Sequence, residues 1–165
     1  MRGISLEEMA AATREALGEE RLAWLSGLPR SLVRGPLALV HATPESLWRA
    51  PAPEASDAEL ELVYATLGQP VAVYGHIHRS FIRGISAIGE LSGRIVANSG
   101  SVGLSYDGDR RAAYLLLEAS ASAVIPVIRR VEYDLDREIR ALSSCGLPHA
   151  DWIARTLESG RAQLP

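Results

Sequence analysis

The chain has 165 residues, with one cysteine and no lysine. The single thiol, Cys145, cannot form a disulfide within the chain, and a buried or inert thiol is the default interpretation. No apolar run approaches the ~18 residues of a membrane-spanning helix. Residues 1–20 form an acidic, helix-favouring segment rather than a basic head followed by an apolar block. We therefore expect a cytoplasmic protein without a secretory signal and without a membrane partner.

Positive charge is supplied by arginine alone. All 17 basic residues are arginines, and 20 acidic residues bring the net charge to −3. This balance argues against a protein that binds nucleic acid through bulk positive charge. The composition, 47% hydrophobic and 22% charged, is that of an ordinary globular protein. With no internal repeat and no linker, residues 1–165 are expected to form a single domain.

The pattern of apolar residues and turn signals predicts an α/β fold. A helix over residues 5–17, with Ser5 as its cap, ends at Gly18, and a second helix follows over 19–26. Continuously apolar runs at 71–74 and 112–117 are expected of strands covered on both faces. The remaining predictions are strands at 37–41, 80–85, 94–97 and 123–133, helices at 57–67 (capped by Asp57), 134–144 and 151–159, and a surface loop at 45–56.

Two of the four histidines stand one residue apart at the end of an apolar run. Residues 71–78 read Val-Ala-Val-Tyr-Gly-His-Ile-His. Alternate side chains of an extended segment point to the same side, so His76 and His78 can present two imidazoles together. Two neutral imidazoles suit a borderline transition-metal ion, and Gly75 lets the backbone approach closely. A solvated or hydrogen-bonded histidine pair at a strand end is the alternative.

Two further segments end in polar residues in a similar way. Residues 37–41 form a short apolar run that ends in His41, and a proline turn follows. Residues 96–103 contain Asn98, the only asparagine, in the run Val-Ala-Asn-Ser-Gly-Ser-Val-Gly. Small side chains, hydroxyls and backbone N–H groups suit a turn that approaches a phosphate or frames a metal pocket. A plain β-turn is the alternative.

Together these segments resemble the C-terminal half of a calcineurin-like metallophosphoesterase of the small bacterial phosphodiesterase or phosphatase type. His-Ala-Thr-Pro at 41–44 is similar to the family's His-Gly-x-Pro, and Gly-His-Ile-His at 75–78 to its Gly-His-Thr-His. Asn-Ser-Gly-Ser-Val-Gly at 98–103 is similar to its Asn-Pro-Gly-Ser-Val-Gly. Three motifs in the family's order make the resemblance specific. It implies part of an α/β/β/α sandwich, mainly one mixed β-sheet with flanking helices.

The resemblance also implies a two-metal site. His41 and His76 would share one divalent ion and His78 would bind the other, with manganese, zinc, iron, nickel and magnesium all open. Such ions lower the pKa of a bound water, so that a hydroxide attacks a phosphate mono- or diester. Nucleic acid enters only as a phosphodiester substrate. The residues expected to bind the substrate are Asn98, Ser99, Gly100, Ser101 and Arg79.

The chain departs from the family in one important respect. The family's N-terminal half supplies Asp-x-His, a Gly-Asp whose aspartate bridges both metals, and Gly-Asn-His, and we find no counterpart of these motifs. The catalytic residues are therefore unknown. We expect that the chain lacks the family's N-terminal half and that the inner face of its sheet loses its usual cover. A second copy or a separate N-terminal half would then be the partner, and the chain alone would be a dimer or an unstable monomer.

Three functions remain open at this point. The first is a metal-dependent phosphoesterase that is incomplete as a catalyst until an N-terminal half or a partner chain completes it. The second is a degenerate, non-catalytic domain that keeps the fold for binding or assembly. The third is a mononuclear metal- or phosphate-binding module built on His41, His76 and His78.

Overall fold

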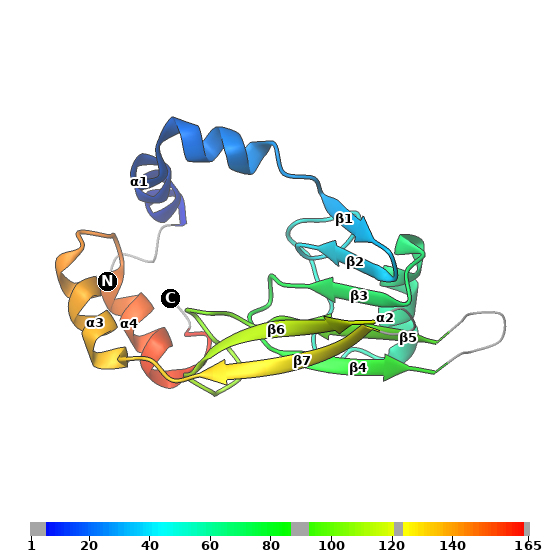
Figure 1. Cartoon of the computed structure of the whole chain (residues 1–165). Helices are drawn as coiled ribbons and strands as arrows, with labels where there is room; N and C mark the ends of the chain where they lie inside the picture. Colours follow the sequence, from blue (N-terminus) through cyan, green and yellow to red (C-terminus); the bar gives the residue numbers. More distant parts are fainter. Residues whose placement is uncertain (1–5, 87–92, 121–123, 164–165) are drawn as a thin grey trace.

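The computed structural model describes residues 6–86, 93–120 and 124–163. Its first element, α1 (Leu6–Ser26), consists of two helices joined at Gly18, whose backbone angles (φ 72°, ψ 169°) are not helical. The predicted break at Gly18 is thus confirmed, whereas the predicted Ser5 cap lies outside the described residues. No residue of α1 is buried. The helix lies apart from the sheet and is joined to it by the segment before β1 (Figure 1).

A five-stranded mixed sheet forms the centre of the molecule. Its strand order is β1-β2-β3-β5-β4, with β2, β3 and β5 mutually parallel and the two outer strands antiparallel to their neighbours. The predicted strands are confirmed within one or two residues. The first strand was not predicted, because its four residues are all exposed and carry no apolar pattern. The strands are β1 (Ser31–Arg34), β2 (Leu37–Val40), β3 (Val71–Tyr74), β4 (Phe81–Ile85) and β5 (Arg94–Asn98).

One face of this sheet is covered by α2 (Asp57–Tyr64), which continues into a 3₁₀ turn. Leu60 and Tyr64 of α2 pack on Ala72 and Tyr74 of β3, and all four side chains are almost fully buried. The cap of the helix is Ser56 rather than Asp57. The Ser56 hydroxyl accepts a hydrogen bond from the third helical N–H, so Asp57 becomes the first helical residue, where its charge suits the helix dipole.

The opposite face is covered by a separate hairpin of β6 (Ala112–Ala119) and β7 (Val124–Val131). Val71 and Val73 of β3 pack there against Val124, because successive strand residues point to opposite faces. Figure 1 shows the hairpin crossing the sheet on the side away from α2. The expectation of an uncovered inner face is therefore wrong where the hairpin lies over β3, whereas at the β1–β2 end of the same face Leu32 remains 42% exposed.

The hairpin itself is covered on one face only. Tyr114 and Leu116 of β6 are 44% and 39% exposed, and Ile125 and Val131 of β7 are 56% and 48% exposed. The expectation that the apolar run at 112–117 is covered on both faces is thus wrong. Among the described residues, no layer packs outside the hairpin to match α2 on the other side of the sandwich.

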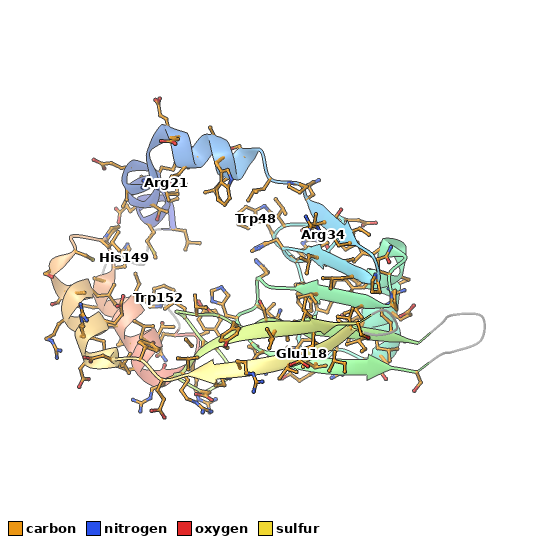
Figure 2. All side chains as sticks on the ribbon, viewed as in Figure 1. Arg21, Arg34, Trp48, Glu118, His149 and Trp152 are labelled. Carbon is orange, nitrogen blue, oxygen red and sulfur yellow. The ribbon has the colours of Figure 1, made fainter. Side chains whose placement is uncertain are left out.

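Two short helices close the described chain. α3 (Leu135–Ser144) and α4 (Ala150–Ser159) pack against each other beyond one end of the hairpin (Figure 1). Figure 2 shows His149, which precedes α4, on the side where α1 begins, and its Nε2 lies 3.2 Å from a Glu8 carboxylate oxygen. None of the described helices has the length and apolar character needed to cross a membrane.

A buried ion pair fastens α2 to the edge of the sheet. The Arg94 guanidinium at the start of β5 donates through Nε to Glu61 of α2 at 3.0 Å, and both side chains are only 7% exposed. Arg94 also donates to the backbone carbonyl of Gln69. A charge buried in this way requires its partner, so the pair sets the position of α2 along the strands.

Candidate metal centre

The three sequence motifs meet at one edge of the sheet. Because β2, β3 and β5 are parallel, their carboxyl ends lie side by side, which is where ligands bind in open α/β sheets. His41 follows β2, Gly75 follows β3, and Asn98 ends β5. Backbone hydrogen bonds tie these ends together: the Gly75 N–H donates to the His41 carbonyl at 2.9 Å, and the Ser99 N–H to the Tyr74 carbonyl at 3.1 Å.

Two of the predicted ligands are in direct contact. His41 Nε2 lies 3.2 Å from His76 Nδ1, and the rings meet edge to face. His76 Nε2 lies 3.1 Å from the carbonyl oxygen of Trp48, which can only accept a hydrogen bond. In the neutral ring Nε2 therefore carries the proton, and the lone pair of Nδ1 is directed toward His41. A backbone carbonyl that orients a histidine from behind is the usual outer support of a metal ligand.

The spacing of this histidine pair fits a hydrogen bond between the two rings and also fits two ligands of one divalent ion. Two nitrogens that each lie ~2.0–2.1 Å from an ion in a tetrahedral site are about 3.3 Å apart. The observed 3.2 Å between His41 Nε2 and His76 Nδ1 agrees with that value. Two imidazole donors are of the kind that zinc or a similar borderline metal prefers.

His78 lies near the pair but is held differently. Its Nδ1 is 2.8 Å from the carbonyl oxygen of Leu104, so Nδ1 carries the proton and Nε2 the lone pair. The ring also stacks on Tyr106 at 4.9 Å. The predicted extended backbone is wrong here: His76 and His78 have φ values of 63° and 54°, in the left-handed region. The chain turns sharply at each histidine, and the two rings are aimed by separate carbonyls.

Burial and the neighbouring histidines favour the neutral form of His41 by lowering its pKa. Burial lowers the pKa of His41, and the nearby imidazoles of His76 and His78 lower it further. A neutral imidazole is the form that binds metals. Ala42, which follows His41, is held by α2, because the buried Tyr64 hydroxyl donates a hydrogen bond to the Ala42 carbonyl at 2.8 Å. α2 thereby holds the loop that carries His41.

In the loop predicted to bind the substrate, the side chains of Asn98 and Ser101 form hydrogen bonds to nearby backbone groups. Asn98 is fully buried; its Nδ2 donates to the Gly75 carbonyl at 2.6 Å and its Oδ1 accepts from the Gly100 N–H at 2.9 Å. The Ser101 hydroxyl accepts the N–H groups of Gly103 and Leu104. Gly100 has φ +74°, and a Cβ there would lie 2.8–2.9 Å from neighbouring Cβ atoms. Asn98 thus locks β5 to the turn that carries the histidines.

Arg79, the remaining predicted substrate contact, is paired with an acid. Its guanidinium donates two hydrogen bonds to the Glu54 carboxylate, and the side chains are 37% and 64% exposed. The hydrogen bond from Arg79 holds the pKa of Glu54 below its usual range. Arg79 therefore joins the loop before α2 to the histidine turn.

A polar cluster beneath this turn was not predicted from the sequence. Arg130 of β7 donates to Asp107 and to the Ser80 hydroxyl, and Asp107 also accepts the Ser80 N–H. Burial is the largest single effect and raises the pKa of Asp107. The hydrogen bonds from the Arg130 side chain and from the backbone N–H groups of Asp109 and Ser80, with the charge of Arg130, together hold that pKa below its usual value. The two-residue period of the strand could have indicated this cluster, because it places Arg130 on the inward face of β7 and Arg129 on the outward face.

The described part of the chain does not complete a metal site by itself. Within residues 6–86, 93–120 and 124–163, no three His, Cys, Asp or Glu side chains converge closely enough to hold an ion. The structure brings together His41 and His76, places His78 beside them with its ring anchored elsewhere, and commits the Asn98 loop to structural hydrogen bonds. Of the residues predicted as ligands, only His41 and His76 are therefore in direct contact.

Two solved structures are similar to this chain. A metallophosphoesterase from Sphaerobacter thermophilus has a TM-score of 0.72 at 25% identity over 88% of this chain and 65% of its own. A hypothetical protein from Pyrococcus horikoshii OT3 has a TM-score of 0.69 at 19% identity over 88% and 56%. Neither a protein-family model nor a curated protein sequence matches the chain. The chain has a metallophosphoesterase-like fold and spans less than two thirds of either structure.

Proposed function

We propose that this chain forms part of a metal-dependent phosphoesterase that hydrolyses phosphate mono- or diesters. The observation that carries the proposal is the contact between His41 and His76 at the carboxyl ends of parallel strands, with 3.2 Å between their nitrogens. The likeness to a metallophosphoesterase of known structure supports it. His41 and His76 would hold one divalent ion, and His78 would bind a second through Nε2.

The roles of the chain's own residues follow from their contacts. The Trp48 carbonyl accepts a hydrogen bond from His76 Nε2–H, which leaves the Nδ1 lone pair for a metal ion. The Leu104 carbonyl accepts one from His78 Nδ1–H, which leaves the lone pair on Nε2. Tyr64 and Asn98 hold the loops on which the histidines stand. A bound divalent ion would supply a water of lowered pKa and would polarise the phosphoryl oxygen.

Catalysis in this proposal needs ligands beyond those of the described residues. Two imidazoles leave at least two positions of a tetrahedral ion open, and a neutral pair does not balance the charge of a divalent cation. The completing carboxylates would come from a further segment or from a second polypeptide. We accordingly expect weak metal binding by the chain alone and little hydrolysis.

A non-catalytic domain is the second candidate, and one observation favours it. The residues expected to meet the substrate are already occupied: Arg79 pairs with Glu54, and Asn98 and Ser101 bond their own loop. In that case the fold would serve binding or assembly, and the histidine pair would be a structural hydrogen bond.

Metal titration distinguishes the two candidates. Isothermal calorimetry with Mn²⁺ and Zn²⁺ is expected to show binding to the wild-type chain and at least tenfold weaker binding to His76→Gly. His149→Gly is the matched control, because His149 also has positive φ (60°) and lies outside the site. Glycine suits both backbones, so neither change introduces strain. Equal metal affinity in all three proteins would refute the proposed metal centre.

Hydrolysis is measured next, with p-nitrophenyl phosphate and bis(p-nitrophenyl) phosphate in the presence of Mn²⁺. Metal-dependent turnover that His76→Gly abolishes and His149→Gly preserves would support the phosphoesterase. Metal binding without turnover would assign the chain an incomplete site, as the ligand count predicts. Turnover unaffected by either substitution would exclude the histidines from the chemistry.

A further inference from the structure

An apolar groove opens directly beside the candidate metal centre. It has a volume of about 480 Å³ and runs between the end of α1, the β1–β2 hairpin and the loop after β2. Its size falls within the ~300–1,000 Å³ of small-molecule sites. The residues that line it include Leu25, Leu28, Leu32, Leu39, Leu47 and His41.

Several leucine side chains that line the groove are partly exposed. Leu25, Leu28 and Leu32 are 43%, 48% and 42% exposed, and they come from three successive elements that converge on one wall. Scattered exposed leucines need no explanation, whereas a contiguous set lining a hollow marks a surface that binds something. Arg30, which also lines the groove, brings a positive charge to it.

The groove is continuous with the histidine pair. His41 belongs to both, and Leu47 precedes Trp48, whose carbonyl orients His76. A hydrogen-bonded turn keeps this connection in place: the Thr43 hydroxyl accepts the Ser46 N–H, and the Ser46 hydroxyl accepts the Trp48 N–H. Figure 2 shows Trp48 between α1 and the β1–β2 end of the sheet. A ligand anchored at the histidines would therefore extend along the leucines.

We propose that this groove receives the apolar alcohol part of a phosphate ester whose phosphate lies at His41 and His76. The inference rests on the proposed function and names its substrate class: esters of a bulky aromatic or branched alkyl alcohol rather than of a sugar. Leucine side chains offer no hydrogen bonds to hydroxyl groups, so a polyhydroxylated alcohol would lose its hydration without compensation. The arginine in the groove adds attraction for the phosphate.

The test separates the groove from the metal centre by using three probes. These are 1-naphthol, which has no phosphate, 1-naphthyl phosphate, and inorganic phosphate, each titrated by calorimetry with and without Mn²⁺. Leu28→Asp places a carboxylate on the groove wall at a half-exposed position. Leu6→Asp is the control, because Leu6 is a leucine that is 74% exposed at the start of α1 and does not line the groove.

We expect 1-naphthol to bind the wild-type chain without metal, and Leu28→Asp to weaken 1-naphthol and 1-naphthyl phosphate by about tenfold or more. Inorganic phosphate should bind both proteins equally, and Leu6→Asp should change nothing. Absence of 1-naphthol binding, or equal binding by Leu28→Asp, would overturn the inference. If 1-naphthol binds in this way but Mn²⁺ does not bind the histidines, the groove is supported and the metal centre is refuted.

Discussion

Replacing Gly100 with alanine tests how tightly the turn after β5 is packed. Gly100 has φ +74°, and an added Cβ would lie 2.8 Å from the Ala113 Cβ and 2.9 Å from the Ser80 Cβ. Both neighbours are short side chains fixed to the backbone, so neither can rotate away. The substitution therefore combines an unfavourable backbone conformation with a steric clash.

The two contributions can be worked out separately. A left-handed conformation costs an L-residue ~1–2 kcal/mol, and overpacking in a close-packed region costs ~1–3 kcal/mol. Gly100→Ala should therefore lower the free energy of unfolding by roughly 2–5 kcal/mol. Gly68 has almost the same φ (+70°) with nothing within 4 Å, so Gly68→Ala should lose only the backbone part. Gly103 has neither constraint, and Gly103→Ala should be close to neutral.

Urea unfolding of the four proteins, followed by circular dichroism at pH 7, gives the comparison. The expected order of stability is wild type and Gly103→Ala together, then Gly68→Ala, then Gly100→Ala. Equal losses in Gly100→Ala and Gly68→Ala would show that the turn gives way to a methyl group. The close contact with Ser80 and Ala113 would then have no energetic consequence, and the reasoning would be refuted.

Three further predictions concern groups that support the site. Glu61→Ala leaves Arg94 buried without its partner and should lower the free energy of unfolding by ~3–5 kcal/mol, measured by thermal denaturation. The double variant Glu61→Leu with Arg94→Met should recover most of the lost stability. No recovery would refute the importance of the ion pair. Tyr64→Phe should lose ~1–2 kcal/mol because the Ala42 carbonyl is left unpaired, and an unchanged urea midpoint would contradict that. The pKa of Asp107 is lowered in the folded protein, so the ionised carboxylate stabilises the fold above the ordinary value of 3.8, and this stabilisation is lost as pH falls through the folded pKa. The difference in unfolding free energy between wild type and Asp107→Asn should therefore be larger at pH 7 than at pH 3. A difference that does not change with pH would count against this reasoning.

Most elements of this fold could be predicted from sequence because each carries a local signal. The break at Gly18, the strand at 71–74 and the Asp134 cap of α3 follow from residue types and spacing. The strand β1 has only four exposed residues, so no period is visible in it. The single-sided cover of β6 could not be predicted, since a continuous apolar run does not reveal which other elements pack on it.

The candidate site was predictable in its members but not in its geometry. That His41 and the histidines at 76 and 78 lie at neighbouring strand ends follows from parallel strands that each end in a polar residue. Which carbonyl orients each ring depends on the loops at Trp48 and Leu104, which are distant in sequence. The cluster of Arg130 with Asp107 likewise forms only when β7 folds over the sheet.

The left-handed backbone at His76 and His78 has a consequence for any attempt to improve this protein. A non-glycine residue in that conformation is disfavoured, and such positions persist when the surrounding structure holds them there. A library selected only for thermal resistance should therefore replace these two imidazoles with glycine or asparagine early, while core residues such as Val96 are retained. In the proposed metal centre, heat tolerance and metal binding would thus be opposed at the same two backbone positions.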